Sequence, residues 1–257
     1  MSTYHTRAIV LRRETWRDAA RLYTLYTREG GKLLAVGRGT RKLLSKLGPH
    51  LEPFTLVDLH LARGRKLDTL CGAILARSPE PLVADDRRYA AASFVAEALD
   101  HFVKLGERDD ELWRLIESWY ADAAVLPEER LMPRLTVFVW RLLSHLGYHP
   151  KLDECCECGK DLRYEHSRFL PARGSAACRF CPLDERALVG SEMLDGTAHA
   201  EIVSVLGGAP SLPIHQATIR ASFALLEAQL DRPLTSLPIL RAHLVTPRAT
   251  MKATYAF

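Results

Sequence analysis

Hydrophobic and polar residues alternate over short stretches in the first 80 residues of the chain. Val57, Leu59 and Leu61 alternate with polar or small residues, the pattern of a strand that buries one face. Runs of this kind, separated by turns, predict five strands, at residues 8–14, 20–31, 32–39, 57–62 and 67–76. The basic residues 40–46 predict a short helix between the third and fourth strands. This order is that of an OB-fold barrel.

The period changes to that of helices after Pro79 and Pro81. Apolar residues recur at helical spacing in four segments, namely 84–105, 109–126, a third that has Pro133 near its start and Gly147 at its end, and 216–230. We therefore predict an α+β protein of several domains. It comprises an N-terminal OB-fold β-barrel domain at residues 1–80 and an α-helical domain at residues 81–257, with an inserted four-cysteine zinc knuckle at residues 151–185.

The positive charge of the chain is concentrated at its front. Residues 1–80 contain 15 Lys and Arg against 7 Asp and Glu, although the formal net charge of the 257 residues is only +4. An anionic partner is thus expected at the front. The start of the chain has no secretory h-region, and no apolar run approaches the roughly 18 residues of a membrane span. We expect a cytoplasmic protein with no membrane partner.

The segment 31–50 has five cations and no carboxylate. A small phosphate ligand, a nucleic-acid backbone and solvent are the three alternatives. A phosphate loop would need tightly spaced glycines at a helix N-terminus, whereas these cations are spread along the segment, which favours a polynucleotide. The residues predicted to bind the polynucleotide are Lys32, Arg38, Arg41, Lys42 and Lys46, with a second rim of Arg63, Arg65 and Lys66.

Aromatic residues of the first hairpin are candidates for stacking on bases. They are Trp16, Tyr23 and Tyr26. Tyr23 and Tyr26 have opposite parity on one strand, so at most one of them is expected to face a nucleic acid, and the other belongs to the core.

Five of the six cysteines fall into two short motifs. Cys155-x-x-Cys158 and Cys178-x-x-Cys181 allow four thiolates to surround one tetrahedral ion, at about 2.3 Å each for Zn²⁺. Rubredoxin-like iron is the alternative metal. Four thiolates leave no open position for water or substrate, so we predict one structural zinc ion per chain.

The remaining cysteines are assigned to other roles. Pairing Cys156 with Cys158 would leave only one residue between two ligands, so Cys156 is predicted to be a spare thiol. Cys71 lies in a predicted strand, and we expect it to be a small core residue.

No catalytic motif is found. GxSxG, HExxH and the Walker loop are absent from the sequence. The tripeptide His199–Glu201 shares its His-x-Glu with zinc deaminases, but in those enzymes the histidine precedes a Pro-Cys-x-x-Cys, and here the order is reversed. We expect a binding protein rather than an enzyme.

Several segments together resemble the bacterial RecO family of DNA repair and recombination mediators. They are "AIVL" near the start, "DAARLYTLYTREGGKLLAVGRGTRK", "LEPFTLVDLHLARGRKLDTL" and the pair "CCECGK" and "CRFC". The resemblance implies a non-enzymatic protein that binds single- and double-stranded DNA through its OB domain and promotes annealing. It also implies contact with the acidic tail of the single-stranded-DNA-binding protein, and joint action with RecR in loading the RecA recombinase.

Two other functions remain as alternatives. An RNA-binding or translation-associated OB-fold protein with a structural zinc knuckle would have the same electrostatics, and a nucleic-acid competition series would distinguish it. A nuclease or deaminase is disfavoured because the sequence offers no paired carboxylates and no open metal site.

The third predicted helix carries a row of arginines. At 100° per residue, Arg130, Arg134 and Arg141 fall within about 40° of one another, beside an apolar face that includes Phe138. Guanidinium groups bordering an apolar groove suit an acidic peptide that ends in a hydrophobic residue. These arginines are therefore predicted to bind the acidic tail, with ion pairs to neighbouring helices as the alternative.

Overall fold

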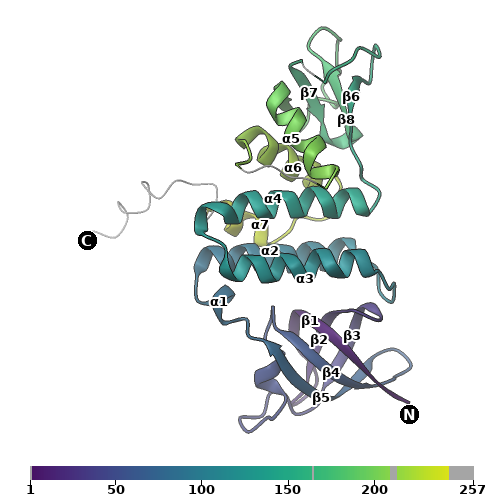
Figure 1. Ribbon diagram of the computed structural model, residues 1–257. Coiled ribbons are helices and arrows are strands. Elements are labelled where there is room, and N and C mark those ends of the chain that lie inside the picture. The colour runs from purple at the N-terminus through teal and green to yellow at the C-terminus, as the bar shows by residue number, and fades with distance from the viewer. Residues whose placement is uncertain (1, 164, 209–212, 243–257) are drawn as a thin grey trace, which may run out of the picture. The chain divides into compact units, whose positions relative to one another are not determined.

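The computed structural model describes residues 2–163, 165–208 and 213–242 (Figure 1). The chain divides into two compact units, Met1–Leu126 together with Leu234–Phe257, and Pro127–Pro233. The first unit thus continues beyond the expected domain boundary at residue 80. Among the described residues, none of the helices combines the length and hydrophobicity that a membrane span requires.

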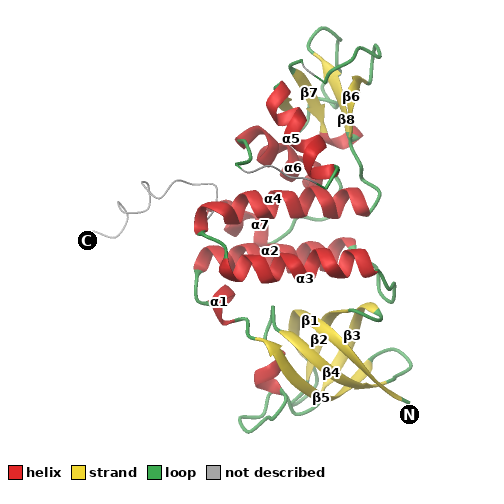
Figure 2. Ribbon diagram, viewed as in Figure 1, coloured by secondary structure: helices red, strands yellow, loops and turns green. Residues whose placement is uncertain are grey.

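Five strands form a closed barrel in the first unit (Figure 2). They are β1 (Thr3–Thr15), β2 (Arg21–Thr27), β3 (Gly31–Gly37), β4 (Leu56–Ala62) and β5 (Asp68–Arg77). Their order around the barrel is β1-β2-β3-β5-β4, with β1 paired to both β2 and β4. The predicted five strands and the OB-fold architecture are confirmed.

The barrel is closed by a short parallel pairing between β3 and β5. Only two residue pairs form it, Ala35 with Asp68 and Val36 with Thr69. All other neighbouring strands of the barrel are antiparallel. The closure removes the exposed sheet edges that β3 and β5 would otherwise present.

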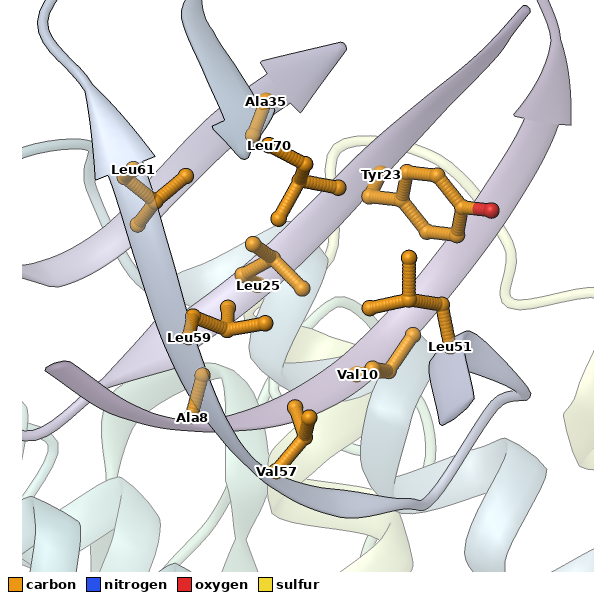
Figure 3. Close-up of a cluster of buried hydrophobic side chains, with 10 residues drawn as sticks. All are labelled: Ala8, Val10, Tyr23, Leu25, Ala35, Leu51, Val57, Leu59, Leu61 and Leu70. Atoms are coloured by element: carbon orange, nitrogen blue, oxygen red, sulfur yellow. The ribbon is translucent and has the colours of Figure 1, made fainter. Parts of the chain in front are cut away.

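The barrel interior is filled by side chains that alternate along the strands (Figure 3). They are Ala8, Val10, Tyr23, Leu25, Ala35, Leu51, Val57, Leu59, Leu61 and Leu70. The alternation of Val57, Leu59 and Leu61, visible in the sequence, is the face of β4 that points inward. Leu51 comes from a short 3₁₀ helix, η1 (Gly48–Leu51), rather than from a strand.

Residues 40–46 do not form the predicted basic helix. They adopt successive hydrogen-bonded turns, in which the Lys42 N–H donates to the Gly39 carbonyl (3.1 Å) and the Ser45 N–H to the Lys42 carbonyl (3.0 Å). Gly39 has a φ of +71°, which interrupts a helical path. The Thr40 hydroxyl also donates to the Gly37 carbonyl (2.8 Å), a local bond that competes with helix formation.

Cys71 lies in β5 as predicted, but its side chain is exposed. The pairing of β4 with β5 shifts at this point, because His60 pairs with Gly72 whereas Leu61 pairs with Leu70. Cys71 is the extra residue of this bulge and leaves the inward-facing series. The prediction of a core residue was wrong.

Among the described residues, four α-helices belong to the first unit. They are α1 (Glu80–Val83), α2 (Asp86–Phe102), α3 (Asp110–Val125) and α7 (Ser236–Leu240). The two long ones match predicted helices, and each begins at an aspartate that caps it. Asp85 accepts from the Arg88 N–H (2.8 Å), and Asp109 accepts from the Leu112 N–H (2.8 Å).

The second unit begins with α4 (Glu128–His145), which starts before the predicted position and carries Pro133 in its interior. Its end is as predicted. Gly147 has a φ of +94°, its N–H donates to the Ser144 carbonyl (3.1 Å), and the Tyr148 N–H donates to the Leu143 carbonyl (2.8 Å). These two bonds form a Schellman motif, which needs a left-handed residue after the helix.

A small sheet and two further helices complete the second unit. The strands are β6 (Lys151–Cys155), β7 (Ser167–Leu170), β8 (Ser175–Cys178) and β9 (Glu192–Leu194), in the order β6-β8-β7-β9. The helices are α5 (Gly196–Leu206) and α6 (Gln216–Ala228). Only α6 was predicted. The strands are too short to show a clear alternation of side chains.

A carboxylate of α2 holds the returning C-terminal segment in the first unit. Glu97 accepts four hydrogen bonds, from the backbone N–H and hydroxyl of Thr235 (2.9 and 2.8 Å) and from those of Ser236 (2.8 and 2.5 Å). Burial opposes ionisation of Glu97, but these donors outweigh it and hold its pKa below the usual value.

We expect Glu97→Gln to lower the free energy of unfolding by about 1 kcal/mol at neutral pH, because the four donors lose a charged acceptor. A depressed carboxyl pKa contributes stability above the pKa of the unfolded chain and loses it as pH falls through the folded value. The difference between parent and variant should therefore shrink on acidification in urea titrations. Glu107→Gln, at an exposed site, is the control. A difference that does not change with pH would contradict this account.

Candidate nucleic-acid interface and metal centre

Three connecting segments meet where β3 ends. The β1–β2 loop (residues 16–20) adjoins this point because the first residue of β2 pairs with the last residue of β3. The β4–β5 loop (residues 63–67) adjoins it as well, since the first residue of β5 pairs with Ala35. The third segment, residues 38–47, leaves β3 here. OB folds bind oligonucleotides through loops in these positions.

Hydrogen bonds join two of these segments. The Arg41 N–H donates to the Ala19 carbonyl (3.1 Å), and the Arg41 guanidinium donates to the Asp18 carbonyl (2.7 Å). Both acceptors are neutral backbone groups. These bonds therefore hold Arg41 in place without neutralising its positive charge.

Seven of the eight predicted DNA-binding residues lie exposed on the segment 38–47 and the β4–β5 loop. We call them the rim cations: Arg38, Arg41, Lys42, Lys46, Arg63, Arg65 and Lys66. Within the part of the chain that the structure describes, none of them forms a salt bridge.

Other arginines of the same barrel are neutralised by carboxylates. Arg7 pairs with Asp58 through two hydrogen bonds (2.7 and 2.9 Å), and Arg13 pairs with Glu52. The pairing with Asp58 holds the pKa of that carboxyl below its usual range. The rim cations, in contrast, have no such carboxylate partners among the described residues.

The carboxylate of Asp68, which follows the β4–β5 loop, is occupied by neutral donors. Asp68 accepts from the Tyr4 hydroxyl and from the Gly64 N–H (2.9 Å). Burial and the bond to Asp68 raise the pKa of Tyr4, which stays a neutral donor. The Arg63 guanidinium stacks over the Tyr4 ring at 4.6 Å from its centroid. Asp68 thus orders the loop and leaves its cations unpaired.

Lys32 does not belong with the rim cations, contrary to prediction. Its side chain is buried, and its ammonium donates to the backbone carbonyl of Asp100 (2.6 Å) and lies 3.5 Å from the Asp100 carboxylate. Asp100 belongs to α2, so Lys32 fastens the barrel to this helix. A buried ammonium held in this way cannot reach a phosphate.

Tyr23 and Tyr26, the two tyrosines of β2, are both buried. Tyr23 belongs to the barrel interior, and Tyr26, on the other face of β2, stacks on Trp113 of α3 with ring centroids 6.3 Å apart. Neither can stack on a base. Trp16 is 36% exposed in the β1–β2 loop, with the Arg17 guanidinium 6.0 Å from its ring centroid. Arg17 was not among the predicted residues.

The four predicted ligand cysteines come together in the second unit. Cys155 ends β6 and Cys178 ends β8, and these two strands are parallel neighbours. Their carboxyl ends therefore lie at the same edge of the sheet, and the turn that follows each strand carries its second cysteine to the same place.

The sulfur atoms have the spacing of a tetrahedral site. All four lie within 4.8 Å of one another, with Sγ–Sγ distances of 3.9 Å for Cys155–Cys181, 3.9 Å for Cys158–Cys178 and 3.5 Å for Cys178–Cys181. Tetrahedral coordination at a metal–sulfur distance of about 2.3 Å places the sulfurs ~3.8 Å apart. The four cysteines can hold a metal ion.

The electrostatics of the cluster favour a cation. Burial opposes ionisation of Cys155, but backbone donors, among them the Cys178 N–H at 3.2 Å, outweigh it and lower the pKa of the thiol to about 6. Contacts with the sulfurs of Cys178 and Cys158 raise the pKa of the Cys181 thiol. One thiol thus ionises readily, whereas another resists ionisation beside it. A bound metal ion relieves this repulsion between neighbouring thiolates. Cys156 is exposed and lies outside the group, as expected of a spare thiol.

His199 and Glu201 take part in structural contacts instead of the metal centre. His199 Nε2 lies 3.2 Å from an Asp153 oxygen. The buried Glu201 carboxylate accepts from the His215 N–H (3.0 Å) and the Thr218 hydroxyl (2.6 Å), which satisfies donors at the start of α6.

The three predicted peptide-binding arginines all lie on α4, including Arg130, but their apolar neighbours are core residues. Leu135, Phe138 and Leu142 are fully buried, so no open apolar groove borders the row. The Arg141 guanidinium donates to the Val205 carbonyl (3.4 Å) at the end of α5. Burial and then the charge of Arg134 lower the pKa of Arg141, so these two guanidinium groups are close enough to repel.

Comparisons with known proteins identify the family. Residues 1–79 match the family described as "Recombination protein O N terminal", and residues 84–239 match "Recombination protein O C terminal". The chain belongs to the RecO family. The resemblance found in the sequence is confirmed, and with it a role in DNA repair and recombination.

Individual relatives carry the name "DNA repair protein RecO". The protein of Rubrobacter xylanophilus is 36% identical over 184 residues, which cover 72% of this chain and 73% of that protein. That of Desulfitobacterium hafniense is 34% identical over 183 residues, covering 70% and 65%. That of Thermobifida fusca is 35% identical over 184 residues, covering 70% and 74%.

The four-cysteine cluster predicts one bound metal ion per chain. Cys178→Ser should lose this ion and lower the free energy of unfolding by at least about 2 kcal/mol, because metal binding stabilises only the folded chain. Metal content and urea unfolding measure both effects. Cys156→Ser, a neighbouring thiol outside the cluster, should change neither. Parent protein purified without chelators and free of metal would contradict the prediction.

Proposed function

We propose that this RecO-family protein binds single- and double-stranded DNA through the rim cations and has no catalytic activity of its own. The observation that carries the proposal is the set of seven exposed, unpaired cations on two segments that adjoin the end of β3. Such a surface attracts a polyanion and releases its condensed counterions on binding. We place its action at the nucleoid, in the cytoplasm.

The family role favours DNA over RNA as the polyanion. An RNA-binding OB-fold protein would use the same cations, so the choice rests on family membership. Competition of labelled single-stranded DNA with unlabelled DNA and RNA of equal length tests it. Tighter binding of RNA would favour the alternative.

Annealing and recombinase loading extend the proposal. Cations that neutralise phosphates reduce the repulsion between two complementary strands, which supports a role in annealing. The family resemblance supplies the partners, namely RecR, the single-stranded-DNA-binding protein and, indirectly, RecA. Annealing of complementary oligonucleotides at increasing salt tests the first of these roles.

We further propose that the metal is Zn²⁺ in a structural role. Four cysteine sulfurs at tetrahedral spacing are a donor set that zinc favours, and they fill every coordination position. Iron in the same donor set would give a coloured protein. Elemental analysis separates the two metals.

The α4 arginines remain a proposed site for the acidic tail of the single-stranded-DNA-binding protein. The support is electrostatic, since an acidic peptide would bring carboxylates to a helix face on which the positive charges of Arg134 and Arg141 repel each other. Because the adjacent apolar face is buried, Arg130 and Arg134 are expected to contact the acidic residues of the peptide. Arg141 is held at the end of α5.

The rim predicts a defined salt dependence. Arg41→Ala/Lys42→Ala should remove two phosphate contacts and reduce the slope of log K against log salt by about 1.4–1.8, equally for all DNA sequences. Arg7→Ala/Arg13→Ala removes the same charge from arginines paired with carboxylates and is the matched control. Equal slope changes in the two variants would remove these rim residues from the interface.

The tail site predicts a separate effect. Arg130→Ala/Arg134→Ala should weaken binding of a labelled acidic tail peptide about tenfold, as expected for lost charged contacts, and leave DNA affinity unchanged. Fluorescence anisotropy measures both. Arg220→Ala, whose guanidinium is paired with Glu192 in the same unit, is the control. Unchanged peptide affinity in the double variant would place the peptide elsewhere.

A further inference from the structure

Two leucines stand fully in solvent in the middle of the basic segment 38–47. Leu43 is 100% exposed and Leu44 is 92% exposed, the highest values for large apolar side chains among the described residues. The next highest are Val125 at 79% and Ile74 at 71%. A pair of adjacent, almost fully exposed leucines lowers the solubility of a protein and indicates a surface that a partner covers.

The backbone on both sides of the pair is fixed. On one side, the Arg41 N–H is bound to the Ala19 carbonyl (3.1 Å) of the β1–β2 loop. On the other, the Ser45 N–H is bound to the Lys42 carbonyl (3.0 Å), and the Ser45 hydroxyl accepts from the Gly48 N–H (3.0 Å). The leucines are therefore presented at the tip of an ordered turn.

Charge limits what can cover this tip. The leucines are flanked in sequence by Arg41, Lys42 and Lys46, all exposed and all without a carboxylate partner among the described residues. An occupant must offer apolar surface and negative charge within a few ångströms of each other. Unstacked DNA bases do so, because their faces are apolar and each is joined to a phosphate.

Apolar side chains are used in this way by proteins that open base stacks. Leucine, isoleucine and phenylalanine wedges insert between base steps while cations hold the flanking phosphates. The β1–β2 loop, which Arg41 joins to the tip, adds the half-exposed Trp16 as a second surface for a base.

We propose that Leu43 and Leu44 form an apolar wedge that packs against unstacked bases, in single-stranded DNA and at frayed duplex ends. The rim cations hold the adjoining phosphates. This inference rests on the proposed DNA-binding function and adds to it a contact that distinguishes unpaired from paired DNA. In a continuous duplex a wedge would first have to unstack a base step, at a cost of roughly a few kcal/mol, so the wedge favours unpaired DNA.

The test compares Leu43→Ser/Leu44→Ser with the parent on two DNAs, a single strand that contains 2-aminopurine and a closed circular duplex. The variant should bind the single strand about tenfold more weakly, since two leucines lose a buried contact, and should no longer change the 2-aminopurine fluorescence. Affinity for the closed duplex, and its salt slope, should stay within twofold of the parent. Ile74→Ser, an exposed apolar residue on the barrel wall, should behave as the parent.

Each other outcome overturns the inference. Unchanged single-strand affinity in the leucine variant, or equal weakening on both DNAs, removes the wedge but leaves the rim intact. If the parent binds neither DNA, the proposed function itself fails. Binding of the parent to vesicles of phosphatidylglycerol, lost in the leucine variant without any loss on DNA, would assign the tip to lipid instead. Equal melting temperatures of variant and parent exclude unfolding as a cause.

Discussion

The face that we propose binds DNA depends on the two residue pairs that close the barrel between β3 and β5. Without this seam, β3 and β5 would be sheet edges, and the β4–β5 loop would have no fixed neighbour. With it, Asp68 lies opposite Ala35, and the loop that precedes Asp68 is placed beside the segment that leaves β3. The seam is parallel and short, so it contributes little hydrogen-bond energy. The ten-residue core inside the barrel stabilises the closed form instead.

Charge in the first unit is divided between two kinds of contact. Arg7, Arg13 and Lys32 are bound to carboxylates or to a helix, and they stabilise the fold. The rim segments are ordered by neutral groups, as in the bond from Arg41 to the Asp18 carbonyl and the bond from the Gly64 N–H to Asp68. Neutral contacts fix the geometry of the rim and leave its positive potential intact. The remaining repulsion between rim cations is relieved when an anion binds.

The sequence was sufficient for those features whose causes are local. Strand alternation, the long helices α2 and α3 and the glycine Gly147 that ends α4 each depend on a few adjacent residues, and the structure contains all of them. The cysteine cluster was predicted for the same reason, since each motif fixes two ligands within one turn. The prediction of a helix at residues 40–46 was wrong, although the conformation of this segment also has a local cause. The composition favoured a helix, but the positive φ of Gly39 and the hydrogen bond of the Thr40 hydroxyl produce turns instead.

Features that depend on distant residues could not be predicted. The burial of Lys32 requires Asp100 of α2, and the burial of Tyr26 requires Trp113 of α3. The alternation of residues along a strand indicates whether a side chain points into the barrel or out of it. It does not indicate which part of the outer surface of the barrel a helix will cover. Lys32 and Tyr26, which were candidates for contact with DNA, are therefore buried against helices. The exposure of Leu43 and Leu44 could not be predicted for the same reason. Apolar residues are expected to be buried, and the residues next to them in the sequence do not reveal that they stay exposed.

The small sheet of the second unit is a part of the fold that a metal ion bound by the four cysteines would stabilise. Strand β6 pairs with β8 through two residue pairs, and the register shifts between them. Strands β7, β8 and β9 have three or four residues each. A sheet this short has little independent stability. The cysteines end the two parallel strands, where an ion bound by all four would hold both turns and keep the strands in register. Since the four sulfurs fill a tetrahedral site, such an ion has no position left for a substrate. The proposed binding of DNA therefore relies on the rim cations of the first unit and not on the cysteine cluster.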